Sequence, residues 1–346
     1  MQPSKVNFGL VNDSETLVKK KTGPGIAKAH KDKNLCHPGE ISQTQMLRVQ
    51  LQACEVLQGT FDMIDLSPVC VLGTNSVLAD ISQKTVLSAL RDVEVVADPT
   101  TALALEAVRR KSQGSKNDET LRLASCIRTL RLQSFQNNPG FSNHFLALGM
   151  ISLGQDIGHR AFEIQELRTH ISGSLKVISD LKGASLSKMT VYFSDTRIMH
   201  AICQSTGVDA STISPMSRQS GFSAFNHLNV TLPRYISSPS EIVDRAKYGS
   251  EFDRAMNEID FFWNSAIKVL TEQYPSVEFI LHLDRLAGIN YYNGPCFKLR
   301  AQNSRGEVYP LMDGGRVDWA TKLTGSKKDK MFSTGIGLEL LEKQFT

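Results

Sequence analysis

The chain has 346 residues, of which 41% are hydrophobic and 21% charged, and its formal net charge is +4. This length and composition are typical of a globular protein with one large core, and so small a charge does not by itself indicate nucleic-acid binding. The sequence contains neither the apolar stretch of a signal peptide nor a run of about 18 apolar residues that could cross a membrane. We therefore expect a cytoplasmic protein.

The six cysteines are far apart in the sequence and form no CxxC pair, and no cluster of Cys and His has the spacing of a zinc site. We expect reduced, mostly buried thiols. Neither a metal ion nor a cofactor is expected.

The first 35 residues are polar and rich in lysine, with Lys19-Lys20-Lys21 followed by Gly23-Pro24-Gly25. Such a sequence predicts a flexible, irregular basic arm over residues 1–35. Contact with RNA is one reading of this arm, and a solvated terminus is the more common one. The folded core is then predicted over residues 36–346.

The core begins with a wide apolar stripe that predicts a helix over residues 43–57, ended by Gly59. Alternation over residues 61–66 predicts a strand that stops at Pro68. A short strand over residues 93–96 leads into an Ala- and Leu-rich helix.

Two strands, near residues 122–132 and 144–153, flank the turn sequence Asn137-Asn138-Pro139-Gly140, which predicts an antiparallel hairpin. A helix over residues 164–181 and a strand over residues 190–193 come next. These elements precede a long helix-rich segment.

That helix-rich insertion is predicted over about residues 196–275, and Ser238-Pro239-Ser240-Glu241 within it has the sequence of a capping box. Three strand-like runs then follow, over residues 277–283, 290–299 and 307–311, and they predict an antiparallel sheet. Strands at both ends of the core, with no βαβ alternation and no phosphate-binding glycine loop, indicate an α+β protein.

Five segments resemble the catalytic core of a class II aminoacyl-tRNA synthetase, and the histidyl enzyme is the nearest member. The segment from Ala287 to Phe297 (AGINYYNGPCF) is similar to the histidyl signature R-G-[LIY]-D-Y-Y-[TN]-G-x-x-F, and Gly314-Gly315-Arg316-x-Asp318 is similar to the next landmark. Residues 97–102 (ADPTTA) are similar to the R-P-[DE]-x-T-A loop. The hairpin over residues 128–154 resembles motif 2, and residues 335–339 (GIGLE) resemble motif 3.

The resemblance implies an antiparallel sheet flanked by helices, with a helical insertion. It also implies a pocket for a histidine-like ligand, with Asp98, Thr100, Asn290, Tyr291 and Tyr292 as the candidate lining residues. If the two tyrosines belong to a strand, one of them should point inward and the other should point across the sheet.

The sequence departs from the family at positions needed for adenylation. Leu340 replaces the motif 3 arginine and Ala287 replaces the catalytic arginine of the histidyl signature, while Ala147 and Ile151 stand where a Gln and an acid are expected, and Leu146 where a His is expected. Arginines clamp the phosphates of ATP in this chemistry, and loss of one such donor costs about 10²–10³ in rate. We therefore assign no catalytic residue.

Three other arginines bear on this interpretation. Arg128 and Arg131 are the residual candidates for the motif 2 arginine, whereas Arg285, two residues before Ala287, is interpreted as a charged surface residue.

A synthetase core without these arginines, and without a following anticodon-binding domain, resembles the regulatory-subunit family of ATP phosphoribosyltransferase. The helix over residues 43–57 and the strand that stops at Pro68 resemble motif 1, which builds the dimer interface in the synthetase family. The resemblance therefore implies a non-catalytic protein that forms a homodimer through this helix and strand. It also implies binding to the short catalytic subunit, a requirement for its activity, and histidine feedback in histidine biosynthesis; tRNA and membranes are not expected partners.

Whether histidine itself binds is left open, because Ala147 and Ile151 lack the polar groups that would hold its amine. Two other functions also remain open at this point. One is a synthetase-like ligase that forms an amino-acyl adenylate, and the other is a pseudo-synthetase that serves as a scaffold for a different partner.

Overall fold

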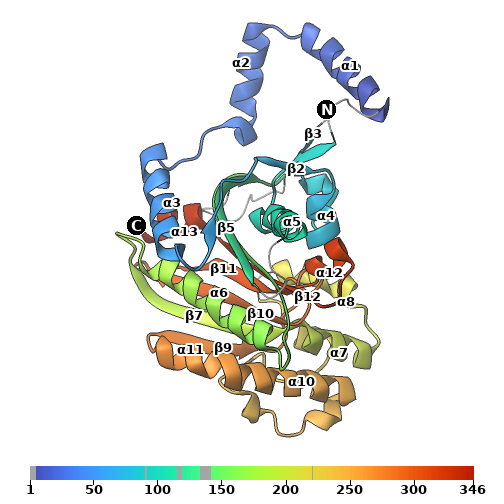
Figure 1. Ribbon diagram of the computed structural model, residues 1–346, viewed down its shortest axis with the longest axis vertical. Coiled ribbons are helices and arrows are strands. Elements are labelled where there is room, and N and C mark those ends of the chain that lie inside the picture. The colour runs from blue at the N-terminus through green and yellow to red at the C-terminus, as the bar shows by residue number, and fades with distance from the viewer. Residues whose placement is uncertain (1–4, 90–91, 115–118, 133–141, 220) are drawn as a thin grey trace.

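The computed structural model describes residues 5–89, 92–114, 119–132, 142–219 and 221–346. Within these ranges a nine-stranded sheet crosses the molecule in the order β1-β5-β6-β12-β11-β10-β7-β9-β8 (Figure 1). Its strands are β1 (Asp62–Met63), β5 (Leu121–Leu130), β6 (His144–Gln155), β7 (Leu186–Asp195), β8 (Tyr235–Ile236), β9 (Val277–His282), β10 (Pro295–Asn303), β11 (Val308–Val317) and β12 (Asp329–Ile336). The pairs β1–β5 and β7–β9 are parallel, and the other neighbouring pairs are antiparallel.

A second, smaller sheet has the order β2-β4-β3 in the described residues and consists of β2 (Val69–Val71), β4 (Val93–Val95) and β3 (Ser88–Ala89). The helices are α1 (Lys5–Lys19), α2 (Gly23–Asp32), α3 (Gln43–Leu57), α4 (Thr74–Ala79), α5 (Pro99–Ser112), α6 (Ala161–Ser179), α7 (Thr196–Thr206), α8 (Ala210–Ile213), α9 (Ala224–His227), α10 (Ser250–Phe262), α11 (Lys268–Gln273), α12 (Trp319–Thr324) and α13 (Leu338–Phe345). None of the described helices is long and apolar enough to cross a membrane.

Helices cover both faces of the large sheet and create two large apolar cores in the described residues, beside a small cluster of Cys70, Val96 and Ala102. The larger core combines α3, α6, α10 and α13 with one face of the sheet, and the smaller core combines α4, α5 and α12 with the other. Strand β6 contributes to both, because its side chains alternate: Leu148 and Met150 belong to the larger core, whereas Ile151 and Leu153 belong to the smaller one. The sheet is therefore buried on both sides near β6.

Helix periodicity and strand alternation predicted much of the core correctly. The helix predicted over residues 43–57 is α3, and Gly59 just after it has the left-handed φ of +84°. Strands β5 and β6 pair antiparallel from Leu121↔Leu153 to Leu130↔His144. The turn sequence predicted between them, Asn137-Asn138-Pro139-Gly140, lies outside the described residues.

The described part of the N-terminal arm contains the helices α1 and α2, so the prediction of an irregular conformation was wrong for residues 5–32. Helix α2 has the local signals of a real helix, because Thr22 accepts a hydrogen bond from Gly25 N and Pro24 lies in the first turn. In Figure 1, α1 and α2 project away from the sheet. No side chain of α2 is buried.

Two further predictions need correction in the C-terminal half. The strand predicted over residues 290–299 begins at Pro295, and the residues before it form turns. Strand β12, which pairs with β6 and β11 at the centre of the sheet, was not predicted. The insertion contains the expected helices together with β8, and the Ser238 capping box forms but caps only a three-residue 3-10 helix, Pro239–Glu241.

Candidate ligand pocket

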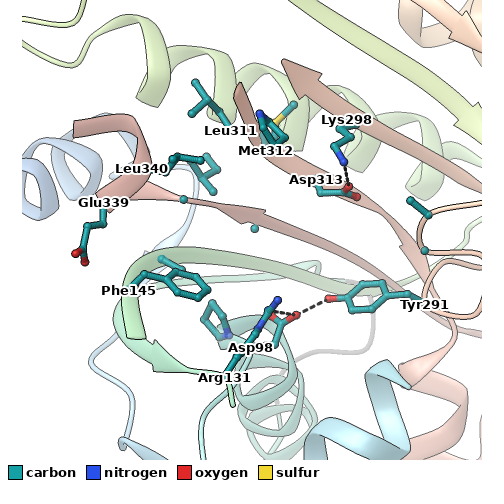
Figure 2. Close-up of a pocket in the computed structure, with 18 of the residues that line it drawn as sticks. Asp98, Arg131, Phe145, Tyr291, Lys298, Leu311, Met312, Asp313, Glu339 and Leu340 are labelled. Atoms are coloured by element: carbon teal, nitrogen blue, oxygen red, sulfur yellow. Dashed lines mark hydrogen bonds and ion pairs between the residues drawn. The ribbon is translucent and has the colours of Figure 1, made fainter. Parts of the chain in front are cut away.

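A cavity of about 450 Å³ lies on the α5 face of the large sheet (Figure 2). This is a volume in which a small metabolite fits. Its lining comes from the start of α5 (Asp98, Pro99), from β6 (Phe145, Ala147), from β10 and β11 (Lys298, Pro310, Leu311, Met312, Asp313), from the end of β12 and the start of α13 (Gly335, Ile336, Gly337, Glu339, Leu340), and from a turn that contains Gly288, Tyr291 and Tyr292. Segments far apart in the sequence therefore meet in one hollow.

Asp98 and Tyr291 meet on one wall of this cavity. Asp98 is the N-cap of α5 and accepts hydrogen bonds from Thr100 N (3.0 Å) and Thr100 Oγ1 (2.6 Å). Tyr291 Oη donates to Asp98 Oδ2 at 3.2 Å and lies 2.9 Å from Thr100 Oγ1. Burial and the Asp98 carboxylate both raise the pKa of Tyr291, so its phenol keeps its proton and acts as a donor.

Tyr292 also faces the pocket, so the expectation that the two tyrosines point to opposite sides was wrong. Both belong to a turn, in which their backbone N–H groups donate to Gly288 O, and turn geometry does not impose strand alternation. Tyr292 Oη donates to Asp313 Oδ1 at 2.6 Å. Gly288 has φ +80°, and a Cβ there would lie 2.8 Å from the Tyr292 ring, so glycine is required at this position.

Arg285 is buried, at 4% exposure, which corrects its interpretation as a surface residue. Its Nη2 donates to Asp313 Oδ1 at 2.7 Å, its Nε donates to Ala287 O at 2.9 Å, and its guanidinium lies 5.3 Å from the centre of the Tyr292 ring. Burial by itself would lower the pKa of Arg285, but the Asp313 carboxylate raises it above its usual value. The side chain is therefore a permanent cation.

The two candidate motif 2 arginines have different surroundings. Arg131 lines the cavity: its Nε donates to Ala97 O at 2.7 Å, and its guanidinium lies 3.6 Å from Asp98 Oδ2 and 5.7 Å from the centre of the Phe145 ring. Arg128 is not part of the lining and pairs with Glu339 at 2.9 Å. Arg131 alone of the two is therefore placed to meet a ligand.

Asn290 does not belong to the cavity either. It is exposed, and its Nδ2 donates to Asp80 Oδ2 at 3.2 Å. Of the predicted pocket residues, the structure thus brings together Asp98, Thr100, Tyr291 and Tyr292. Asp98, Tyr291 and Tyr292 line the cavity, whereas Thr100 does not line it and contacts Asp98 and Tyr291.

Two of the residues at positions where the family resemblance places arginines line the cavity. Leu340 and Ala287 both face it, and so does Ala147. Ile151 is fully buried in the smaller core, and Leu146 points to the opposite face of β6, into the larger core. The hollow thus presents apolar surface where cations are expected in an adenylating enzyme.

Two charged residues of the lining, Lys298 and Asp313, were missed by the sequence analysis. They are cross-strand partners in β10 and β11, with Lys298 Nζ 3.9 Å from Asp313 Oδ2. Lys298 stands between the buried Phe297 and Leu299. Along β10 the polar residues Lys298 and Arg300 alternate with buried apolar residues, and this alternation was the signal that the charges lie on the opposite, pocket-facing side.

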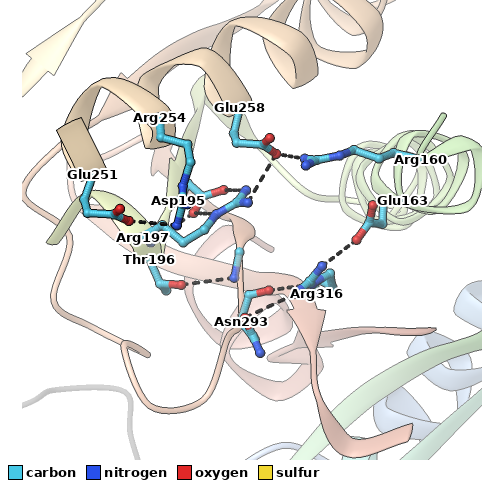
Figure 3. A network of polar contacts seen from close by, with 11 residues as sticks. Arg160, Glu163, Asp195, Thr196, Arg197, Glu251, Arg254, Glu258, Asn293 and Arg316 are labelled. Carbon is cyan, nitrogen blue, oxygen red and sulfur yellow. Dashed lines mark hydrogen bonds and ion pairs between the residues drawn. The ribbon is translucent and has the colours of Figure 1, made fainter. Parts of the chain in front are cut away.

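Arg316, from the landmark sequence, does not belong to the cavity. Figure 3 shows it in a polar network, where its Nη1 donates to Glu163 at 2.6 Å and its Nη2 donates to Asn293 Oδ1 at 3.2 Å. The network also contains Arg197, which pairs with Asp195 and Glu258 and so ties the insertion helix α10 to the end of β7. We assign a structural role to these contacts.

No group of three or more His, Cys, Asp or Glu side chains in the described ranges is arranged to hold a metal ion. All six cysteines are free thiols. The lining of the pocket itself supplies carboxylates, cations, hydroxyls and apolar surface.

No protein-family profile and no curated protein sequence matches the chain. The fold does match solved structures. One, from Bacillus halodurans, is described as an ATP phosphoribosyltransferase regulatory subunit/histidyl-tRNA synthetase; the TM-score is 0.64 at 16% identity, covering 88% of this chain and 80% of that chain.

Two further structures agree with it. The histidine–tRNA ligase subunit of Alicyclobacillus acidocaldarius gives a TM-score of 0.63 at 14% identity and covers 88% of this chain and 95% of that one. The histidyl-tRNA synthetase of S. aureus gives 0.58 at 12% identity, with 88% and 71% covered. The chain therefore has the class II synthetase-like α+β fold of the histidyl group, as its motifs predicted.

Proposed function

We propose that the chain is a non-catalytic regulatory subunit of ATP phosphoribosyltransferase, which binds the short catalytic subunit and senses a small amino-acid ligand. The observation that carries this proposal is the lining of the first cavity, which includes Leu340 and Ala287 at the two positions where the family resemblance places phosphate-binding arginines. Without these donors the phosphoryl transition state loses its main stabilisation. The likeness to the Bacillus halodurans structure supports the same reading.

The pocket has groups suited to a zwitterionic amino acid. Asp98 offers a carboxylate for an ammonium group, and Arg131 offers a guanidinium for a carboxylate. At the other end Asp313, whose side chain is 38% exposed, offers an acceptor for an imidazole N–H, beside the apolar side chain of Met312. Histidine is therefore the first ligand to test.

Feedback by such a ligand requires that it bind two states of the complex with unequal affinity. Asp98 caps α5 and bonds to the Tyr291 turn, so a ligand that contacts Asp98 acts at the junction of these two segments. We propose that ligand binding at this junction shifts the equilibrium between the two states of the complex.

Homodimerisation through the helix α3 and the strand that follows it is part of the proposal. Two apolar side chains of α3, Leu47 and Leu51, are exposed at 57% and 59%. Because they lie four residues apart, they share one face of the helix. A second copy of the chain would cover this face.

The test is reconstitution with the short catalytic subunit from the same source. We expect a complex in size-exclusion chromatography, a faster formation of phosphoribosyl-ATP than with the catalytic subunit alone, and inhibition by histidine. Asp98→Asn should weaken the inhibition, whereas Asp318→Asn, on a carboxylate outside the cavity, should not. No complex and no stimulation would overturn the proposal.

An adenylate-forming ligase is the second candidate, because the cations Arg131 and Lys298 do line the cavity. Exchange of labelled pyrophosphate into ATP, measured with each amino acid in turn, distinguishes it from the regulatory subunit. The regulatory proposal predicts no exchange above the enzyme-free rate. If exchange and reconstitution are both negative, the chain is a scaffold for a different partner.

A further inference from the structure

A second cavity, of about 430 Å³, lies beside the first and shares Ala287 and Lys298 with it. Its walls come from β7, β8, β9 and β10 and from the insertion. Strand pairing explains how its side chains gather: Tyr192 of β7 is the register partner of Lys298 of β10, and Tyr235 of β8 is the partner of His282 of β9. Arg300 lies two residues after Lys298, and both line this cavity.

Positive charge exceeds negative charge around this cavity. Four cationic side chains line it, namely Arg234, Arg285, Lys298 and Arg300. The carboxylates that pair with them are Asp284, with Arg234, and Asp313, with Arg285 and Lys298. Four cations against two carboxylates leave an excess of two positive charges.

Both carboxylates already accept hydrogen bonds from neighbouring groups, and Asp284 accepts more of them than Asp313 does. Asp284 accepts hydrogen bonds from Ser223 Oγ at 2.8 Å, from Ala224 N at 3.1 Å and from His282 Nε2 at 2.9 Å, in addition to its ion pair with Arg234 at 2.9 Å. Asp313 Oδ1 accepts from both Arg285 and Tyr292. Asp284 is therefore saturated by the groups that surround it, whereas Asp313 Oδ2, which in the described residues has only the 3.9 Å contact with Lys298, can still accept a hydrogen bond.

Two of the cations remain incompletely paired. Arg285 Nη1 is buried and has no hydrogen-bond partner among the described residues. Arg300 makes no ion pair within the described part of the chain, and Lys298 reaches Asp313 only at 3.9 Å. Burial lowers the pKa of Lys298, Asp313 partly offsets this, and Arg285 and Arg300 lower it further, which places the three cations close together.

The other wall of the cavity is aromatic. The rings of Tyr235 and His282 are 4.7 Å apart, those of Tyr192 and Tyr235 are 5.4 Å apart, and the Arg234 guanidinium lies 5.4 Å from the centre of the Tyr235 ring. Burial lowers the pKa of His282, so this ring is neutral near pH 7 and adds no charge. Cations beside aromatic rings suit an anion that carries a planar group.

We propose that the second cavity is a binding site for the phosphate group of a small phosphorylated molecule. A clustering of like charges in a cavity is unfavourable unless an anion neutralises it. A phosphate supplies enough acceptor oxygens to satisfy the unpartnered Arg285 Nη1 together with Lys298 and Arg300. The proposal does not rest on the amino-acid-binding role of the first cavity, although Lys298 lines both cavities.

The test is isothermal titration of the full chain with inorganic phosphate, pyrophosphate and adenosine 5′-monophosphate at about 0.15 M salt, where long-range attraction is screened. We expect saturable binding, weakened about tenfold or more by Arg300→Gln and by Lys298→Gln, because each removes one charge-assisted hydrogen bond. Tighter binding of the monophosphate than of phosphate would show that the site takes a phosphate ester and uses the aromatic wall. Equal or tighter binding of free phosphate would show that it takes the inorganic anion.

Two control variants keep the proposal falsifiable. Arg254→Gln removes the same charge from an exposed position outside both cavities, and it should not change the affinity. Arg131→Gln alters only the first cavity. The proposal is overturned if no probe saturates, if Arg254→Gln weakens binding as much as Arg300→Gln does, or if Arg131→Gln weakens it while Arg300→Gln does not.

Discussion

The hydroxyl of Tyr291 donates to the carboxylate of Asp98 across 193 positions of sequence, at 3.2 Å. This contact joins the turn before β10 to the N-terminus of α5 and forms one wall of the first cavity. The wall depends on both side chains, since Thr100 also bonds to each of them.

Tyr291→Phe should therefore lower the free energy of unfolding by about 1–2 kcal/mol, because it removes the donor from a buried carboxylate. The matched control is Tyr274→Phe, since the buried Tyr274 hydroxyl has no hydrogen-bond partner in the described residues. That change should be neutral or stabilising. Urea denaturation measures both, and an equal loss in the two variants would contradict the assigned bond.

Gly288→Ala should destabilise the protein more than Gly306→Ala. Both glycines have a left-handed φ, +80° and +83°, so each substitution carries the backbone cost of about 1 kcal/mol. At Gly288 the new Cβ would also lie 2.8 Å from the Tyr292 ring, whereas the nearest atom at Gly306 is 3.7 Å away. Thermal unfolding of the two variants checks the order, and a reversed order would argue against the Tyr292 position.

Arg122→Met should cost about 3–5 kcal/mol, because it leaves a buried carboxylate without its partner. Arg122 donates twice to Glu166, at 2.9 Å and 2.6 Å, and the Glu166 side chain is fully buried. Arg109→Met, which breaks the exposed pair with Glu106, should leave the stability unchanged. Chemical denaturation distinguishes the two, and a similar midpoint for both would show that the Arg122 pair is not buried.

Stability should fall as the pH drops below about 6.5, partly because of His170. This ring is fully buried between Ser152 and Thr334, each at 2.8 Å, and burial lowers its pKa from 6.5 to about 3. Between these two values the unfolded chain binds a proton that the folded chain does not. The free energy of unfolding therefore decreases by up to about 1.4 kcal/mol per pH unit as the pH falls.

The variant His170→Gln should flatten this slope between pH 6.5 and pH 4.5, and His200→Gln, at an exposed position, should not. Denaturation midpoints across this range give the slope directly. An unchanged slope in His170→Gln would mean that the ring is already protonated in the folded protein.

Helix periodicity and strand alternation were sufficient for the elements whose burial is regular. Helix α3 follows from apolar spacing, the pair β5–β6 follows from two strand-like runs on either side of a turn sequence, and the family motifs led to Asp98, Tyr291 and Tyr292. Periodicity failed for the Tyr291–Tyr292 segment, because an apolar, aromatic run has the same composition in a turn that is held by Gly288 as in a strand.

The roles of the charged residues were the least predictable. Arg285 was taken for a surface residue because its burial depends on Asp313, which lies 28 residues later on β11. Asn290 belongs to the histidyl signature, but its side chain turns outward to Asp80. Both outcomes are set by tertiary contacts between distant segments, which no local pattern contains.

The most direct test of the regulatory account is the initial rate of phosphoribosyl-ATP formation by the catalytic subunit, measured with and without this chain over a series of histidine concentrations. The account predicts that the chain raises the rate, that histidine lowers it again, and that Asp98→Asn shifts the half-inhibiting concentration of histidine upward by about tenfold or more. A rate that neither the chain nor histidine changes would contradict it.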